Sequence, residues 1–342
     1  MKKIIRLFVV FFVCGLSGVI AFAEPSIIIS EGKYVMGDLD TKKDAKTQAL
    51  LEAKRMAMEK AGTYLESFTE VKDFKLSKDQ IKTVAAGIMS VEVLNEDWKM
   101  SGENMVLTIQ IRATVDTSNL KNRISKIQEG DNTDSFKEVQ SQLAALQKEL
   151  AELKKQAQQQ ADSMGTKKQP SQEIKEKHEA LVNDMSAWEY MGKGVNARVD
   201  QRWEESAEAF GQVIALNPRI SNAYAGKAFA LYNLKKQDEA LELVNKALAI
   251  NPVSAKSLGV KALILKDQPG KVDLAMDTIN QAIKLQPNLS QLYGFRGGIF
   301  MKMGKFHSAL ADFAKACQMG MKESCVRAKG LEEKMKAGKR RN

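Results

Sequence analysis

The chain has 342 residues, of which 27% are charged and 44% hydrophobic, and its formal net charge is +10. This length is sufficient for two or three domains. The basic residues are scattered along the chain apart from a tail at Lys339, Arg340 and Arg341. A nucleic-acid-binding protein needs a concentrated basic patch with aromatic residues between the charges, so we expect no nucleic-acid partner.

Residues 1–23 have the pattern of a secretory signal peptide. A basic start, MKKIIR, precedes a short apolar run, LFVVFFVCGLSGVI, and the sequence Ala21-Phe22-Ala23 follows as an A-x-A cleavage site. The apolar run is too short for a comfortable membrane span, although an uncleaved N-terminal anchor is the alternative. We expect export to the periplasm, a mature chain that begins near Glu24 and no integral membrane span after cleavage. Association with the outer membrane is left open.

Residues 24–128 are predicted to form a small α/β domain with the order β-α-α-β-β. A β-rich run, SIIISEGKYVMGD, precedes a helix that ends at about Glu66, and Thr41 with Asp44 forms a capping box at its start. A second helix is predicted over 78–89 with Ser77 as its N-cap. Two strands, SVEVLNEDWKM and NMVLTIQIRATVD, then meet at a hairpin turn, and a short helix covers about 118–128.

The first of these helices has one apolar stripe, because its apolar residues recur at steps of three and four. The stripe consists of Ala45, Ala49, Ala53, Met56, Ala57, Ala61 and Tyr64. Before this helix stand Asp38 and Asp40, two carboxylates of the kind that bind divalent cations. No further oxygen ligand follows at a suitable spacing. We therefore interpret both as residues that solvate a turn and favour the helix N-terminus, and we predict no metal and no cofactor.

The phrases EGKYVMGD, ALLEAKRMAMEKAGTYLES and VLTIQIRATVD in this order of elements resemble the N-terminal domain of flagellar assembly protein T. They also resemble a family of small lipoproteins of the outer membrane. The resemblance covers most of the predicted α/β domain. It implies a periplasmic interaction module and carries no catalytic residue over to this chain.

A polar helix with an apolar seam is predicted over 134–160. Its seam residues step alternately by three and four, as in a coiled coil: Phe136, Val139, Leu143, Leu146, Leu150, Leu153 and Ala157. Because such a helix has no core of its own, we expect self-association through residues 136–157, as a dimer or trimer. The alternative is that the seam folds back onto a flanking domain. Residues 161–186 are predicted to be a polar linker and a lead-in helix.

Residues 187–330 contain one phrase four times: EESAEAFGQVIALNP, DEALELVNKALAINP, DLAMDTINQAIKLQP and HSALADFAKACQMGM. Pro218, Pro252 and Pro287 end the first three phrases and are 34 and 35 residues apart. Self-similarity at this period predicts stacked helical hairpins. In each phrase a small residue precedes a bulky residue by four positions, and a small or β-branched residue follows three later. The small residues let helices approach closely, and the prolines end each hairpin.

This pattern of small residues, bulky residues and prolines resembles the tetratricopeptide (TPR) repeat family, over about four hairpins. We therefore predict an α + α/β fold class, with the small β-α-α-β-β domain, the short coiled coil and a C-terminal all-α solenoid, and a basic tail at 331–342. Cys317 and Cys325 are separated by seven residues that lead from one helix onto the next. A related class of secreted hairpin repeats has disulfides at this spacing, so a structural disulfide is expected in an oxidising compartment, against two reduced packing cysteines.

In the TPR family the first helices of the hairpins line a concave groove, and this resemblance supplies candidates for partner contact. The candidates are Met191, Arg198, Asn222, Phe229, Tyr232, Lys256, Lys266 and Gln291. We expect the groove to bind an extended or helical peptide with apolar anchors and some acidic residues. Packing between repeats is the alternative role for each residue. Some family members grip a C-terminal carboxylate with Lys and Asn, but those positions hold Met191, Val195 and Gly226 here, so no such clamp is expected.

The sequence has no G-x-S-x-G elbow, phosphate loop, H-E-x-x-H helix or Cys-x-x-Cys pair, and His178 and His307 each stand alone on a helical pattern. We therefore expect no enzymatic activity. Our leading hypothesis is a periplasmic scaffold or adaptor that binds protein partners in its repeat groove. The alternatives are a structural component of an envelope machine, such as a flagellar or secretion ring, and a regulatory subunit of a cell-wall enzyme.

Overall fold

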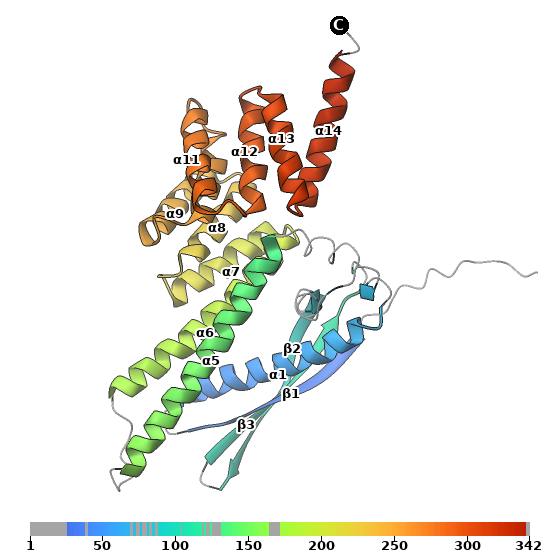
Figure 1. Ribbon diagram of the computed structural model, residues 1–342. Helices are drawn as coiled ribbons and strands as arrows, with labels where there is room; N and C mark the ends of the chain where they lie inside the picture. Colours follow the sequence, from blue (N-terminus) through green and yellow to red (C-terminus); the bar gives the residue numbers. More distant parts are fainter. Residues whose placement is uncertain are drawn as a thin grey trace, which may run out of the picture.

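The computed structural model describes residues 26–37, 40–68, 71–72, 76, 81, 84–85, 88–102, 104–117, 120, 124, 131–163 and 172–339. The predicted signal peptide, Asp38 and the predicted cap Ser77 lie outside these residues. Figure 1 shows a sheet with one helix across it, a pair of long helices, and an array of shorter helices that ends at the C-terminus. The α + α/β fold class is confirmed.

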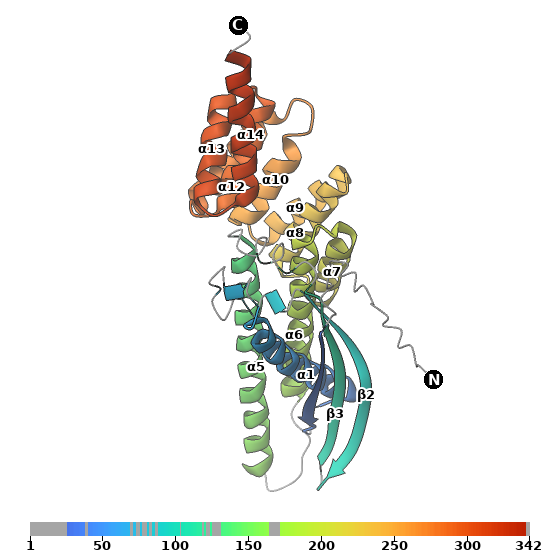
Figure 2. The same ribbon diagram turned by 90° about the vertical axis from the view of Figure 1, so that its right-hand side faces the viewer.

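The described strands form one antiparallel sheet in the order β1-β3-β2. Strand β1 spans Ser26–Val35, β2 spans Met89–Ser101 and β3 spans Asn104–Val115. The predicted hairpin between β2 and β3 is confirmed, with a β-bulge between Val93 and Asn95. In the central strand β3, Leu107, Ile109 and Ile111 are buried, because helix α1 covers that face of the sheet (Figure 2).

Helix α1 spans Lys42–Leu65, and the predicted capping box is present: Thr41 Oγ1 accepts from the Asp44 N–H, and the Asp44 carboxylate accepts from the Thr41 N–H. The alanines of its stripe are fully buried against the sheet. They bring the backbones so close that a Cβ on Gly32 of β1 would lie 2.0 Å from the Ala49 carbonyl oxygen. Helix and sheet are therefore in backbone contact at Gly32.

The described parts of the other two predicted helices of this domain are helical as well. Ile81, Val84 and Ala85 belong to the first of them, and Leu120 and Ile124 to the second. All are buried in one cluster with the C-terminal end of α1. The predicted β-α-α-β-β order is confirmed for the residues described.

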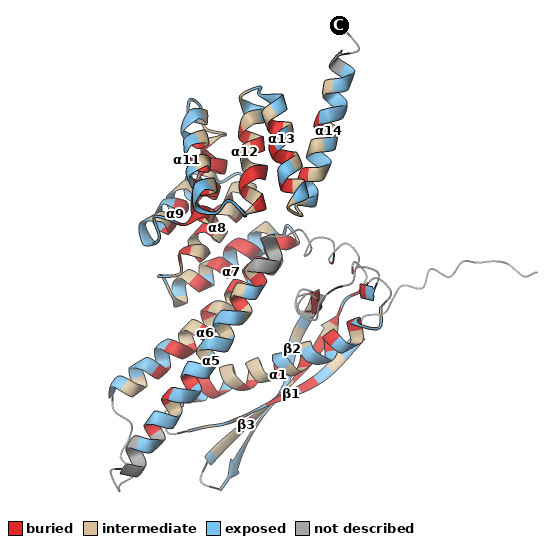
Figure 3. Ribbon diagram, viewed as in Figure 1, coloured by how far each residue is buried: buried red, intermediate tan, exposed pale blue. Residues whose placement is uncertain are grey.

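Helices α5, Asp131–Ser163, and α6, Gln172–Val199, pack side by side along their length (Figures 1 and 3). The seam of α5 is buried within the chain. Phe136 and Val139 lie with Met191 and Val195 of α6, and a second cluster holds Leu150, Leu153, Leu181, Val182 and Met185. The prediction of self-association through 136–157 is therefore wrong for this fold, and the alternative, in which the seam folds back, is confirmed. The apolar face of α6 covers the leucines that a second copy would have covered.

A buried charged cluster joins the sheet domain to this helix pair. The Asp40 side chain is fully buried and accepts hydrogen bonds from Lys154 Nζ of α5 at 2.9 Å and Tyr34 Oη at 3.0 Å. His178 Nε2 of α6 lies 3.0 Å from the same carboxylate. Asp40 also accepts from the Gly37 N–H at 2.7 Å. Asp40 does shape a turn, but the interpretation that it is solvated there is wrong, and His178, which stands alone in sequence, packs against its carboxylate.

The repeat array comprises α6, α7 (Trp203–Leu216), α8 (Ser221–Asn233), α9 (Gln237–Ile250), α10 (Ala255–Leu265), α11 (Val272–Leu285), α12 (Ser290–Lys302), α13 (Phe306–Gln318) and α14 (Lys322–Lys339). Consecutive helices from α6 to α13 pack as four hairpins, as predicted. The turns inside these hairpins share one backbone state, with positive φ at Gln201, Lys235, Gly270 and Gly304. Phe313 shows the expected packing of bulky on small residues, because a Cβ on Gly297 would lie 2.7 Å from its ring.

Two predicted boundaries differ from the structure. The lead-in helix and the first repeat helix are one continuous helix, α6, so the boundary at residue 187 falls inside it. The predicted basic tail begins inside α14, where Leu331 is buried with Ala309 and Phe313 of α13. Apolar contacts therefore continue the solenoid by one helix. In the part of the chain that is described, no helix has the length and hydrophobicity needed to cross a membrane.

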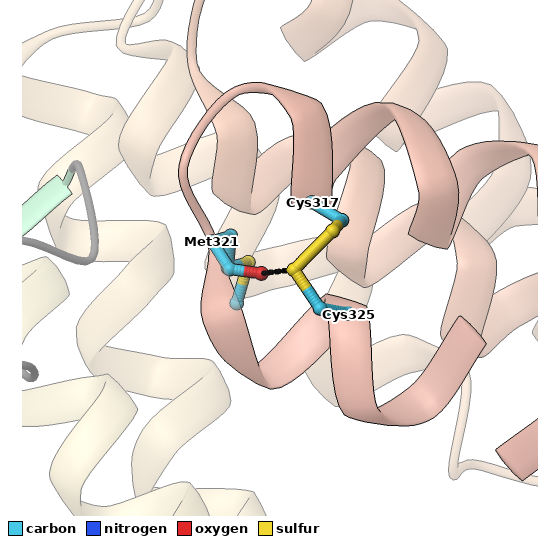
Figure 4. Close-up of a disulfide and its surroundings, with 3 residues drawn as sticks. All are labelled: Cys317, Met321 and Cys325. Carbon is cyan, nitrogen blue, oxygen red and sulfur yellow. Dashed lines mark hydrogen bonds between the residues drawn. A yellow bond between two sulfur atoms is a disulfide. The ribbon is translucent and has the colours of Figure 1, made fainter. Parts of the chain in front are cut away.

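A disulfide joins Cys317 at the end of α13 to Cys325 in the first turns of α14 (Figure 4). The Cys325 sulfur also lies 3.7 Å from the Met321 carbonyl oxygen. The expected disulfide is therefore present. It fixes the last helix to the array across a turn.

We predict that Gly32→Ala lowers the free energy of unfolding by about 3 kcal/mol, because the new methyl group overlaps the α1 backbone, which cannot move without unpacking the sheet. Gly37→Ala is the matched control, since its Cβ would lie at an ordinary 3.7 Å from the Asp40 carboxylate. Urea unfolding followed by circular dichroism measures both. Equal stability of the two variants would contradict the described contact between α1 and β1.

Because Lys154 belongs to the buried Asp40 cluster, we predict that the stability of the chain depends on pH. Burial lowers the pKa of Lys154 to about 8, so between this value and the ordinary lysine pKa the unfolded chain binds a proton that the folded chain has lost. Stability therefore rises with pH in this window. Relative to Lys154→Met, the wild-type chain should gain on the order of 1 kcal/mol between pH 8 and pH 10, because one pKa unit corresponds to about 1.4 kcal/mol.

Urea unfolding at a series of pH values tests this. Lys148→Met, which removes an exposed lysine of the same helix, should keep the wild-type pH dependence. Parallel curves for the wild type and Lys154→Met would show that the Lys154 ammonium is not desolvated.

Candidate functional site: the groove of the repeat array

The residues predicted to contact a partner lie on the first helices of the hairpins and at one helix end. Met191 and Arg198 lie on α6, Asn222, Phe229 and Tyr232 on α8, Lys256 on α10 and Gln291 on α12, and Lys266 is the C-cap of α10. The structure divides these residues into two parts of one groove. One part is covered by α5 and the other is open.

The covered part consists of Met191, Asn222 and Lys256, on which the first turns of α5 lie. Glu138 of α5 accepts a hydrogen bond from Asn222 Nδ2 at 2.8 Å and one from Lys256 Nζ at 3.3 Å. Met191 is 4% exposed and belongs to the cluster of Phe136 and Val139. A cavity of about 70 Å³ remains between α5 and the groove. A segment of the same chain therefore occupies the positions predicted for a partner.

The open part is a pocket of about 650 Å³, which we call the open pocket. Its lining includes Arg198, Phe229, Tyr232, Lys266 and Gln291 from the predicted set. Leu263, Gly294 and Gly298, which stand at groove-facing positions of the TPR pattern, line it as well. The lining residues that were not predicted are Val199, Gln201, Trp203, Asn233, Lys235, Phe295, Met321, Glu323 and Arg327. The structure thus brings most of the predicted residues together in one hollow.

A row of aromatic rings forms one side of the open pocket. Trp203 and Phe229 meet edge to face with ring centroids 5.8 Å apart, and Phe229 and Phe295 are 6.2 Å apart. The three rings come from α7, α8 and α12. Aromatic side chains in such a row offer a large apolar contact area at low conformational cost. The row suits the apolar side chains of a bound segment.

A hydrogen-bonded network holds Tyr232 and Lys266 in place at the pocket. Tyr232 Oη donates to Asp267 Oδ2 at 2.6 Å, and Lys266 Nζ donates to Tyr232 Oη at 2.9 Å. Lys302 Nζ lies 3.1 Å from the other Asp267 oxygen. Burial, followed by the bond to Asp267, raises the pKa of Tyr232, so its phenol stays protonated. Burial alone would raise the pKa of Asp267, but the three donors lower it to about 2.

The charge that the open pocket offers to a ligand is positive. Lys235 and Arg327 are exposed at its lining, and neither forms an ion pair with another described residue. Glu323 is the acidic residue among those that line the pocket, and the nearby Asp267 is held by Lys266 and Lys302. Exposed cations beside an aromatic row favour an anionic ligand with apolar side chains.

The residues missed from sequence belong to three structural classes. Trp203 is the first residue of α7, Lys235 lies in a turn, and Arg327 lies on α14, which follows the last repeated phrase. The period of 34 residues gives Gln201 and Lys235 equivalent positions in successive hairpins, and it could have predicted that both lie in the turns. Nothing in the repeat pattern points to Arg327. Among the described residues, no group of His, Cys, Asp and Glu side chains is arranged to hold a metal ion.

Comparison with known proteins identifies the repeats. Residues 221–254, which include α8 and α9, match the tetratricopeptide repeat model. A TPR repeat-containing protein of Methanocaldococcus jannaschii is 34% identical over 112 residues, which make up 33% of this chain and 18% of that protein. The chain thus matches less than a fifth of the length of this relative.

Several solved structures are similar to part of the chain. A thermophilic TPR protein of Thermus thermophilus has a TM-score of 0.38 at 19% identity, over 46% of this chain and 89% of that one. YrrB, described as a TPR protein with an unusual peptide-binding site, has a TM-score of 0.33 at 16% identity, over 46% and 83%. Yeast Tom70 has a TM-score of 0.35 at 13% identity, over 48% and 37%. Residues 221–254 are therefore a tetratricopeptide repeat, and they form the second of the four hairpins described above.

Proposed function

We propose that this TPR protein is a non-enzymatic scaffold of the periplasm that binds a segment of a protein partner in the open pocket. The observation that carries the proposal is the pocket itself, about 650 Å³ in volume, with an aromatic row and the exposed cations Lys235 and Arg327. TPR arrays generally bind protein segments on their concave side. The partner segment that fits best presents aromatic or aliphatic side chains beside Asp or Glu.

The export of the chain is proposed on two observations. The signal-peptide pattern of residues 1–23 supports export from the cytoplasm, and the Cys317–Cys325 disulfide supports an oxidising compartment. The resemblance of the sheet domain to flagellar assembly protein T stays a prediction. So do a part in an envelope machine and the regulation of a cell-wall enzyme, and the open pocket does not favour either of them over a scaffold.

Peptide selection tests the pocket. We expect a displayed library of random peptides, selected on the full-length chain, to yield segments that combine acidic and aromatic residues. Arg327→Glu should weaken the recovered peptides at least about tenfold, because a reversed charge at a recognition site repels the ligand. Lys329→Glu makes the same charge change on the same helix outside the pocket and should leave affinity unchanged. Peptides that bind both variants equally would place the binding site elsewhere.

Mass spectrometry of the protein from fractionated cells tests the export. We expect the chain in the periplasmic fraction to begin at or near Glu24, and Cys317 and Cys325 to react with a thiol alkylating agent only after reduction. A chain that retains Met1, stays in the cytoplasmic fraction and has two free thiols would contradict the proposed location while leaving the pocket in place.

A further inference from the structure

We propose that the covered part of the groove is a second binding surface, and that α5 occupies it as a built-in ligand for which a partner helix must substitute. This inference rests on the proposed function, because it assigns a second contact to the same groove. The partner is an amphipathic helix with two apolar residues three positions apart and a carboxylate between them. The first turns of α5 show this chemistry directly.

The polar part of the recognition is a carboxylate between two donors. Glu138 is held by Asn222 of α8 and Lys256 of α10, the second and third repeats of the array. Both donors stand at positions where TPR proteins contact their ligands, and nothing in the hairpins themselves requires an acidic residue there. A neutral donor beside a cation is well suited to read a carboxylate.

The apolar part comes from Phe136 and Val139, which flank Glu138 in the sequence. They are 5% and 6% exposed and lie with Met191 and Val195 of α6. Two apolar residues at this spacing lie on one face of a helix and form the anchors by which a helix binds in a groove. A partner helix with the same three residues reproduces every contact described for Glu138, Phe136 and Val139.

The joint between α5 and the groove has the features of an exchangeable contact. The Glu138 and Lys256 side chains are 35% and 33% exposed, and ion pairs this accessible to water stabilise weakly. The cavity of about 70 Å³ shows that α5 does not fill the groove. The far end of α5 is held separately by Leu150, Leu153 and the ion pair of Lys154 with Asp40. The first turns can therefore leave while the rest of α5 stays in place.

A peptide of this chain's own residues 135–150 is the probe. We expect the labelled peptide to bind the wild-type chain weakly in fluorescence anisotropy, because the tethered α5 competes at a high effective concentration. Glu138→Lys in the full-length chain places a lysine against Lys256 and should raise the affinity for the wild-type peptide at least about tenfold. The matched control is Glu149→Lys, an exposed residue of the same helix, which should behave as the wild type.

A charge swap supplies the second measurement. A chain with Lys256→Glu should prefer the peptide that carries Glu138→Lys over the unchanged peptide. Equal binding to the Glu138→Lys and Glu149→Lys chains, both with wild-type circular dichroism, would overturn the inference, as would a preference that does not follow the swap. Peptides selected for the open pocket, titrated on the same chains, separate the two proposals. Their retained binding alongside loss of the 135–150 peptide overturns only the built-in ligand.

Discussion

The pairing of α5 with α6 is the constraint on which the arrangement of the whole molecule depends. Helix α5 is too polar to form a core by itself, so its seam must be covered, and α6 covers it with Met185, Met191 and Val195. Because α6 is also the first helix of the repeat array, this pairing attaches α5 to the solenoid. One end of α5 then meets the sheet domain and the other end meets the groove.

The buried carboxylate of Asp40 determines how the sheet domain sits on this pair. Removing a carboxylate from water is unfavourable unless donors replace the water, and here Lys154, Tyr34 and the Gly37 N–H donate to it while His178 lies beside it. Lys154 and His178 come from α5 and α6, so the cluster is complete only when both helices and the sheet domain are in place. Such a set of partners favours one relative orientation over others that would bury equal apolar area.

The local elements could be predicted from sequence because their causes are local. The proline period places the hairpins, the alanine stripe places α1 on the sheet, and Thr41 with Asp44 starts that helix. The burial of the α5 seam could not be predicted, because a heptad pattern is satisfied equally by another copy or by α6. The partners of Asp40 were hidden for a related reason: they come from segments far along the chain. Arg327 was missed because α14 lies beyond the repeated phrase.

The covered part and the open pocket share lining residues, so a ligand bound in the open pocket can extend toward α5. Arg198, Phe229 and Gln291 line both the cavity beneath α5 and the open pocket. A segment bound in the open pocket therefore ends against the residues that contact the first turns of α5, with Ser135 lying 3.5 Å from Arg198. A longer segment gains further contacts only where α5 now lies. Those contacts consist of a partly exposed ion pair and two apolar anchors. A partner that supplies the same three groups therefore replaces the contacts of α5 with equivalent contacts of its own. The additional contacts in the open pocket must then outweigh the high effective concentration of the tethered α5.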